Sequence, residues 1–412
     1  MTKRLFVVTS AFPYGKGEQF LETEMQYYPE GTEVTLLPRI AAGRQRALPP
    51  SVRVDRFLAE NAFVKNRWLY VADALRDGLF YKELFSEHGW SAGKLKIFLS
   101  AIYQYRMYLG LFDRYLRQLP SPENAVFYTY WHNVAAYALQ TLKARYGFTL
   151  VSRIHRGDLY RSERPFGYMP LKSHFTKNLD ALYIITPRAK AYLKRTYGFD
   201  ESRLHLARLG VRRRGIETPA TGPKRLHVVS CSFLSDVKRV DCIIDALAIA
   251  AKKQPAIDVK WTHLGDGPLR EALEAQAVRV LAPLENVSWR FAGSLSNDEV
   301  FAFYRDNEAD LFLNTSRSEG VPVSMMEAMS CRIPVAGPDV GGITDMIEDG
   351  ISGRVLPEVP AAETVASVLA ETAFFKRPEV REASYRIFLR RYDAAVNYPA
   401  FAEEILTIKE NG

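Results

Sequence analysis

The chain has 412 residues, of which 47% are hydrophobic and 25% are charged, and its formal net charge is +8. This composition is that of an ordinary globular protein, and the length is sufficient for two domains of about 200 residues each. No stretch reaches the roughly 18 uncharged apolar residues that a membrane-spanning helix needs, so we expect no such helix.

The charge is unevenly divided along the chain. Residues 1–215 contain 34 Lys and Arg against 18 Asp and Glu, a net charge of +16, whereas residues 216–412 have a net charge of −8. A basic half predicts an anionic partner, namely a phospholipid surface, a lipid-diphosphate acceptor or nucleic acid, and a solvated basic surface is the alternative. The three cysteines, Cys231, Cys242 and Cys331, lack the spacing of a zinc site or a disulfide framework, which fits a reducing cytoplasm.

The first half begins with a short apolar run at 5–8, directly after Lys3 and Arg4. A signal peptide also begins with basic residues, but an apolar run this short predicts a buried strand instead. Further apolar runs predict strands at 125–130, 149–154 and 181–185. Two helices are predicted at 66–85 and 94–119, and both are rich in aromatic residues. We expect these aromatics to pack in the core or between domains; a membrane-facing or acceptor-facing surface is the alternative, because basic residues alternate with them.

A segment dense in Arg, Pro and Gly at 212–223 predicts a linker, because Pro and Gly at this density break both helices and strands. After it, predicted strands at 226–230, 259–264, 287–291, 311–314, 333–336 and 353–356 alternate with predicted helices at 241–252, 297–307, 323–330 and 343–348. Such alternation predicts an α/β fold with a doubly wound parallel sheet in each half. We expect domains at 1–215 and 216–376, followed by helices at 377–412 that pack back on the first domain.

The segment Ser318–Met329 carries the strongest functional signal. It follows a buried strand, Gly320 permits a tight backbone, and Pro322 suits a first helical position. The start of the helix offers free N–H groups to a diphosphate, and Glu327, about one turn further on, can accept hydrogen bonds from two vicinal hydroxyls. Glu319 can likewise accept from sugar hydroxyls. The alternative is a capped surface helix with two ordinary glutamates.

Glu319 and Glu327 form an E-x7-E motif that resembles the retaining glycosyltransferases of family 4. The segments 12–22 and 152–164 resemble members of that family that build capsular or lipopolysaccharide chains. The segments 230–239, 263–269, 291–293, 340–342 and 349–353 resemble further motifs of that family in the same order. The resemblance implies the GT-B fold, in which two Rossmann-like doubly wound domains face each other across a cleft. It also implies transfer of a hexose-type sugar from a UDP- or GDP-linked donor to a saccharide or lipid-linked saccharide.

The resemblance implies roles for individual residues. Lys238 would stabilise the departing diphosphate, Glu319 would bind the transferred sugar, and His155 would lie near the reaction centre. The expected donor-binding residues are Gly17, Ser232, Lys238, Arg239, Gly265, Asp266, Gly293, Glu319, Gly320, Val321, Pro322, Val323 and Glu327.

In the first half, the segments 12–22 and 152–164 also resemble the family. The expected acceptor-side residues are Gly15, Lys16, Arg156 and Asp158. A satisfied buried imidazole is the alternative for His155. For Asp158 the alternative is a helix cap or a salt bridge with a neighbouring arginine.

One position departs from the family pattern. Many relatives carry an arginine five residues before the phosphate-loop lysine, where this chain has Phe233, and the usual glycine after the lysine is replaced by Arg239. The donor diphosphate therefore lacks one expected cation, for which Arg239 or a hydrogen bond from Ser232 would have to compensate.

The sequence contains no D-x-D motif between strands of the kind that holds a divalent cation on a sugar nucleotide. We therefore expect a metal-independent enzyme without a cofactor. We expect it in the cytoplasm, at the inner membrane face where the basic half meets anionic lipid. Two alternatives stay open: a membrane-docked binding or scaffold protein that has lost catalysis, for which Phe233 is the argument, and a nucleic-acid-binding protein. The second is disfavoured because no nucleic-acid motif accompanies the charge.

Overall fold

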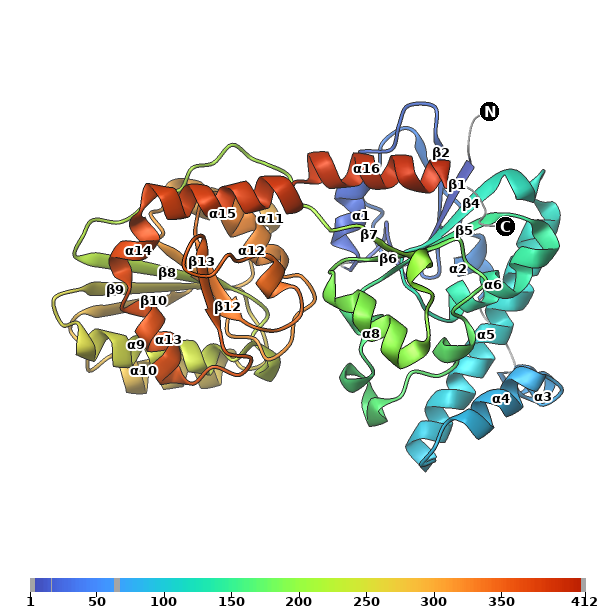
Figure 1. Cartoon of the computed structure of the whole chain (residues 1–412), viewed down its shortest axis with the longest axis horizontal. Coiled ribbons are helices and arrows are strands. Elements are labelled where there is room, and N and C mark those ends of the chain that lie inside the picture. Colours follow the sequence, from blue (N-terminus) through green and yellow to red (C-terminus); the bar gives the residue numbers. More distant parts are fainter. Residues whose placement is uncertain (1–3, 16, 63–66, 409–412) are drawn as a thin grey trace. The chain divides into compact units, whose positions relative to one another are not determined.

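The computed structural model describes residues 4–15, 17–62 and 67–408. The chain forms two compact units: unit 1 comprises Met1–Arg208 and Asn397–Gly412, and unit 2 comprises Leu209–Val396. Figure 1 shows that each unit is built around its own sheet. The expected tail at 377–412 is therefore divided, with 377–396 in unit 2 and 397–412 in unit 1.

Unit 1 has a seven-stranded parallel sheet with the order β3-β2-β1-β4-β5-β6-β7. Its strands are β1 (Arg4–Thr9), β2 (Glu33–Pro38), β3 (Val52–Val54), β4 (Ala125–Thr129), β5 (Thr149–Ile154), β6 (Ala181–Ile184) and β7 (Leu204–Leu206). Its helices are α1 (Gln19–Glu24), α2 (Phe57–Asn61), α3 (Arg67–Ala74), α4 (Gly78–Ser86), α5 (Ala92–Gln118), α6 (Val134–Tyr146), α7 (Arg156–Leu159), α8 (Arg188–Tyr197) and most of α16 (Ala394–Thr407).

Unit 2 has a six-stranded parallel sheet with the order β10-β9-β8-β11-β12-β13. Its strands are β8 (Arg225–Cys231), β9 (Asp258–Leu264), β10 (Val287–Phe291), β11 (Leu311–Leu313), β12 (Val335–Pro338) and β13 (Gly353–Leu356). Its helices are α9 (Val240–Lys253), α10 (Arg270–Leu281), α11 (Asn297–Asp306), α12 (Val323–Ser330), α13 (Ala362–Leu369), α14 (Thr372–Lys376) and α15 (Pro378–Arg391). The prediction of two doubly wound α/β sheets is confirmed.

Side chains of the central strands are buried on both faces of the unit 1 sheet. Phe6 and Val8 of β1 belong to the apolar cluster under α5 and α6, whereas Leu5 and Val7 belong to the cluster that includes α1 and α16. Burial on both faces explains why β1 is a continuous apolar run instead of an alternating one.

Three expectations differ from the structure. The helix predicted at 66–85 is two helices, because the carboxylate of Asp77 accepts the N–H of Leu79 and starts α4 afresh; Asn66 lies outside the described residues. The helix predicted at 343–348 is a single 3₁₀ turn, Ile343–Asp345. The segment 212–223 is attached to unit 2 and is not a loose linker, since Thr221 donates to the Asp310 carboxylate and the Thr218 N–H donates to the carbonyl of Cys331.

A buried ion pair joins α1 to β5 inside unit 1. Glu24 and Arg153 bond directly, and both side chains are completely buried. The Arg153 guanidinium also lies 4.0 Å from the centre of the Phe401 ring on α16. Nε and Nη2 of Arg153 have no hydrogen-bond partner in the described part of the chain, so this arginine depends on Glu24 for charge compensation.

We predict that Glu24→Gln destabilises unit 1 by about 3–5 kcal/mol, because it leaves a buried guanidinium without its counter-charge. Glu22→Gln on the same helix is the control: that side chain is about half exposed, and its ion pair with Arg46 should contribute less than about 1 kcal/mol. Denaturant-dependent hydrogen exchange of peptides from β1, β4 and β5 measures both changes. Equal effects of the two substitutions would contradict the assignment.

Candidate active site

The loops that follow β8, β9 and β10 are joined to one another at the carboxyl edge of the unit 2 sheet. The Ser232 N–H donates to the carbonyl of Leu264 (3.0 Å), and the Leu234 N–H donates to the carbonyl of Asp266 (3.0 Å). Gly265 and Gly293 form a bridge in which the Gly265 N–H donates over 2.8 Å. Residues from three separate parts of the sequence thus form one surface.

Two glycines allow loops to approach each other closely at this edge of the sheet. Gly265 has φ +141°, and a Cβ there would lie 1.9 Å from the carbonyl oxygen of Ser232. Gly341 has φ +55°, and a Cβ there would lie 2.0 Å from the carbonyl oxygen of Glu319. Both positions exclude every other residue, because the backbone conformation and the space each require glycine.

Glu319 and Lys238 form an ion pair at this edge. The Lys238 Nζ lies 2.6 Å from Oε1 of Glu319, whose side chain is buried. The same oxygen accepts hydrogen bonds from the Ser316 hydroxyl (2.6 Å) and the Asn314 amide (3.2 Å). The side chain of Glu319 is therefore held in a fixed orientation.

The loop after β11 is also fastened to the loop after β8. The Thr315 hydroxyl donates to the carbonyls of Arg239 (2.8 Å) and Lys238 (3.2 Å). The Arg317 N–H donates to the carbonyl of Val237 over 2.8 Å. These bonds fix the backbone from which the Lys238 side chain reaches Glu319.

Helix α12 starts beside this pair. Pro322 is the N-cap of this helix, whereas we expected it at the first helical position. Val323 is the first residue of the helix. Gly320 accepts a hydrogen bond from the Gly342 N–H (2.6 Å), while Val321 is buried. The amino end of α12 therefore lies directly after Glu319, with the positive end of its dipole at the carboxyl edge.

Glu327 lies in α12 and is buried, with one carboxylate oxygen accepting a hydrogen bond from the side-chain amide of Asn297. Burial raises the pKa of Glu327 to about 7, and the Asn297 hydrogen bond opposes that rise only in part. Glu327 therefore differs from Glu319: it is held by an amide and not by a cation.

Asp266 of the turn at 263–269 and the remaining residues of the predicted phosphate loop, Phe233 and Arg239, have three different environments. Asp266 is largely exposed, accepts the Gly267 N–H and pairs with Arg270. The Arg239 guanidinium donates to the carbonyl of Pro360 (2.9 Å), so it is engaged elsewhere and not set beside Lys238. Phe233 is 62% exposed.

In unit 1, His155 follows β5 and is buried between two aromatic rings. Its ring centre lies 4.5 Å from that of Tyr130 and 4.8 Å from that of Trp131. Burial, with a smaller contribution from Arg153, lowers the pKa of His155 to about 3, so the imidazole is neutral. Its Nε2 has no hydrogen-bond partner among the described residues.

Asp158 has the capping role that was the alternative for it. Its carboxylate accepts the N–H groups of His155 and His132, each at 2.6 Å, and thereby joins the loops after β5 and β4. The buried Lys172 donates to the carbonyls of Asp158 and His132. Burial raises the pKa of Asp158 to about 6, against the lowering effect of Lys172 and of the N–H groups. Arg156 pairs with Glu163.

Gly15 and Gly17 are exposed in the loop after β1, and Gly15 has φ +68°. Their carbonyls accept hydrogen bonds from Arg46 at 2.6 and 2.9 Å. Lys16, which we expected on the acceptor side, lies outside the described residues.

The structure adds residues that the sequence analysis missed. Asn314 and Ser316 orient Glu319, Asn297 orients Glu327, and Glu18 and Arg46 hold the loop after β1. Asn314 and Ser316 follow a buried strand directly, and this position was the available signal. Asn297, by contrast, is a helix residue 30 positions from its partner, and no spacing rule connects them.

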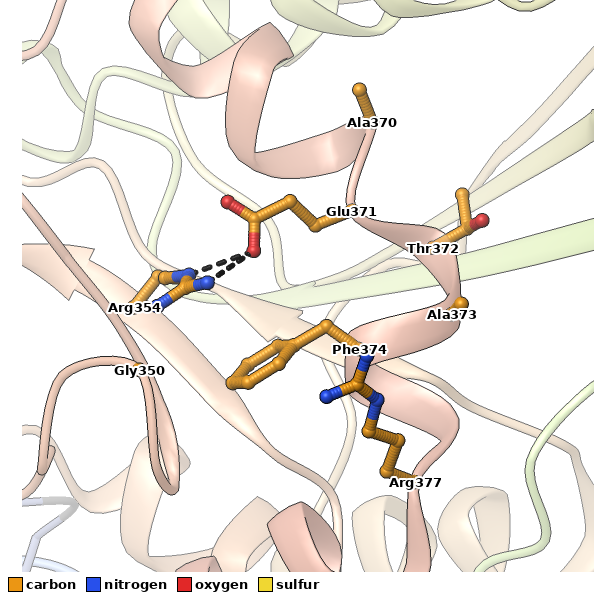
Figure 2. A pocket seen from close by; sticks show the side chains of 8 residues that line it. All are labelled: Gly350, Arg354, Ala370, Glu371, Thr372, Ala373, Phe374 and Arg377. Atoms are coloured by element: carbon orange, nitrogen blue, oxygen red, sulfur yellow. Dashed lines mark hydrogen bonds and ion pairs between the residues drawn. The ribbon is translucent and has the colours of Figure 1, made fainter.

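A surface hollow of unit 2 lies elsewhere (Figure 2). It is lined by residues that include Gly350, Arg354, Glu371 and Phe374, at the amino end of β13. Arg354 donates from Nε (2.8 Å) and Nη2 (2.6 Å) to one oxygen of Glu371, and its guanidinium lies 4.4 Å from the Phe374 ring centre. Because it lies at the amino end of β13 and not at the carboxyl edge of the sheet, the hollow is not part of the candidate site.

Comparison with known proteins gives a family match within unit 2. Residues 225–371 match the family of glycosyl transferases group 1. This part of the chain is a glycosyl transferases group 1 domain. It contains Lys238, Glu319 and Glu327, and it lies entirely within unit 2.

Sequence relatives are similar over part of their length. The amylovoran biosynthesis glycosyltransferase AmsK of Erwinia amylovora is 32% identical over 152 residues, which is 35% of each chain. The putative colanic acid biosynthesis glycosyltransferase WcaL of Salmonella typhimurium is 28% identical over 216 residues, 48% of this chain and 50% of its own. The chain thus aligns with between a third and half of the length of these two relatives.

Solved structures match over the whole chain. The lipopolysaccharide outer core galactosyltransferase WaaB has a TM-score of 0.72 at 16% identity, covering 98% of this chain and 99% of its own. Anabaena HepE in complex with UDP has a TM-score of 0.64 at 17% identity, with the same coverage. These likenesses confirm the expected GT-B fold, each unit being one of its two Rossmann-like halves.

Proposed function

We propose that the chain is a retaining glycosyltransferase that moves a hexose-type sugar from a nucleoside-diphosphate donor to a saccharide or lipid-linked saccharide in surface polysaccharide synthesis. The observation that carries the proposal is the Lys238–Glu319 pair at the carboxyl edge of unit 2, directly before α12. A cation beside a helix amino end is suited to a diphosphate, and a fixed carboxylate is suited to sugar hydroxyls.

In the proposed reaction the bond between the anomeric carbon and the diphosphate oxygen breaks. A bond from that carbon to an acceptor hydroxyl oxygen forms, and the hydroxyl proton is released. The diphosphate leaves with its negative charge, which Lys238 and the first N–H groups of α12 stabilise. Glu327 accepts hydrogen bonds from the ribose hydroxyls and Glu319 from the transferred sugar. In unit 1, His155 is the proposed catalytic residue, and it acts as a neutral imidazole.

The names of the relatives support the proposed donor class and the proposed role in polysaccharide synthesis. HepE has been solved with UDP and glucose, and a Corynebacterium glutamicum relative, 27% identical over 168 residues, is a GDP-mannose-dependent alpha-mannosyltransferase. AmsK, WcaL and TuaC are named for the biosynthesis of amylovoran, colanic acid and teichuronic acid. We therefore propose a UDP- or GDP-linked donor and no cofactor. We also propose that the reaction needs no metal, because Lys238 and the N–H groups of α12 would neutralise the charge of the donor diphosphate.

The second candidate function is a binding or scaffold protein on the same fold that has lost catalysis. It is favoured by Phe233, which leaves the phosphate loop with one cation fewer than in many relatives, and by Arg239, whose guanidinium bonds to Pro360. Turnover of a sugar nucleotide by the purified chain distinguishes the two functions.

We also propose that unit 1 meets an anionic membrane surface at the inner face of the cytoplasmic membrane. Tyr81 and Phe85 lie four residues apart on α4 and are 44% and 75% exposed, so they share one face, with the exposed Lys82 between them in the sequence. Phe166 is 59% exposed and lies against Gly93 at the start of α5. Exposed aromatics beside a basic residue suit the membrane interface, and none of the described helices is long and apolar enough to span a membrane.

Replacement of Glu327 by alanine should weaken donor binding about 10–100-fold and remove transfer, because two charge-assisted hydrogen bonds are lost. Thermal shift with a panel of UDP- and GDP-sugars identifies the donor, and release of the nucleoside diphosphate reports turnover. Glu285→Ala, an exposed position in the same unit, is the matched control. Full activity of the Glu327→Ala variant would contradict the site.

The affinity for a nucleotide sugar should increase as the pH rises from about 6 to 8. Glu327 has a pKa of about 7 in the donor-free chain, and its ionised form accepts hydroxyl hydrogen bonds better than its protonated form. The diphosphate diester of a nucleotide sugar does not titrate in this range, so the dependence reports the protein. Calorimetric titration should show it in the wild type, and the Glu327→Gln variant should bind with a flat profile. A sloping profile in that variant would assign the titration to another group.

Vesicles that contain anionic lipid should retain the chain at low salt, and the double variant Phe85→Ser/Phe166→Ser should bind at least about tenfold more weakly, since each buried aromatic contributes about 1.5–3 kcal/mol. Val278→Ser, which replaces a similarly exposed residue of unit 2, is the control. Co-sedimentation measures the three proteins. Equal retention of all three, or none by the wild type, would refute the membrane proposal.

A further inference from the structure

The loop after β1 is wrapped around the carboxylate of Glu18. Oε1 accepts the N–H of Ser10 and Oε2 accepts the N–H groups of Ala11 and Phe12, all at 2.8 Å. Oε1 also accepts the indole Nε1–H of Trp131 at 2.7 Å. Three successive main-chain N–H groups around one anion form a nest, and here the chain itself supplies the anion.

Glu18 has a backbone conformation that a glutamate rarely adopts. It is the residue before α1, and its φ is +55°. Such a conformation costs about 1–3 kcal/mol and persists only where surrounding contacts determine it. The four hydrogen bonds to its carboxylate are those contacts, since they require the side chain to turn back over its own loop.

The fourth bond of Glu18 is with Trp131, and the Trp131 ring in turn contacts His155, the predicted catalytic histidine. Trp131 follows β4, and its indole ring lies 4.8 Å from the ring of His155 on the loop after β5. Glu18 fixes the N–H edge of that indole, so it also limits where the His155 ring can lie. One carboxylate therefore couples the loops after β1, β4 and β5.

Arg46 supports the same loop from a second direction. Its guanidinium donates to the carbonyls of Gly15 and Gly17, pairs with Glu22 and lies over the Phe12 ring. The anionic contact at Glu18 and the cationic contact at Arg46 both bind main-chain atoms of the loop. The loop is consequently held in shape by charges of the chain itself.

We propose that Glu18 is a positioning residue for the reaction: it orders the loop after β1 and, through Trp131, holds the His155 ring in place. This proposal rests on the proposed function, because it gives His155 its role there. Glu18 itself is already bonded to four N–H donors, so it acts through its neighbours and not on the substrate.

The test compares Glu18→Gln and Trp131→Phe singly and together. The first keeps the side-chain size but loses the anionic acceptor, and the second keeps an aromatic ring but loses the indole N–H. For the sugar nucleotide that binds best, we expect each single variant to lower kcat of donor turnover about tenfold with little change in donor KM. Because both act on the same contact, the double variant should lose much less than the product of the two single losses. Glu30→Gln, at an exposed position shortly after α1, is the control.

A second readout does not need turnover. In ¹⁵N-indole spectra the Trp131 Nε1–H resonance, assigned by its loss in Trp131→Phe, should shift and exchange faster in Glu18→Gln but not in Glu30→Gln. An unmoved resonance, multiplicative losses in kcat, or a loss confined to donor KM would overturn the Glu18 proposal alone. A kcat loss that is matched by a lower melting temperature of unit 1 would also overturn it. Absence of turnover and of donor binding in the wild type would instead contradict the proposed function, and with it the catalytic part of this proposal.

Discussion

Both sheets consist of parallel strands, and this constraint determines where chemistry can take place in the chain. The carboxyl ends of parallel strands lie along one edge, so loops that are distant in sequence meet there. The hydroxyl of Thr315 bonds to the carbonyls of Lys238 and Arg239, which lie 77 and 76 positions earlier in the sequence. Without that convergence, Lys238 and Glu319 would be two unrelated residues in the sequence.

The same edge is used differently in the two units. In unit 2, opposite charges are paired across loops, so Lys238 and Glu319 bond to each other. In unit 1, the buried Asp158 accepts main-chain N–H groups from the loops after β4 and β5. Glu18 accepts main-chain N–H groups from the loop after β1. Unit 2 thus has a cation that can exchange partners, whereas Asp158 and Glu18 of unit 1 are bonded to N–H groups that hold loops in place.

The sequence was sufficient for the doubly wound sheets and for the loops that carry Lys238, Glu319 and Glu327, because buried parallel strands are apolar runs and these candidate residues follow them. It was insufficient for short edge strands such as β3, whose three residues have no distinct pattern. It was also insufficient for contacts such as that from Asn297 to Glu327, which depend on how helices pack. The segment at 212–223 was misjudged as a linker for a related reason: its composition is that of a loop, but Thr218 and Thr221 bond to residues about 90–110 positions away, and no local pattern encodes such bonds.

The two glutamates of the E-x7-E motif differ in the number and charge of their hydrogen-bond partners. Glu319 accepts from an ammonium, a hydroxyl and an amide, so its charge is compensated before any ligand arrives. Glu327 is buried with one amide partner, and burial brings its pKa to about 7. A carboxylate with few partners gains more from two incoming hydroxyl donors than one that is already satisfied. Glu327 is therefore the residue through which donor binding should respond to pH. In the proposed reaction Glu319 would first give up part of its bond to Lys238, and that exchange would free the ammonium for the diphosphate.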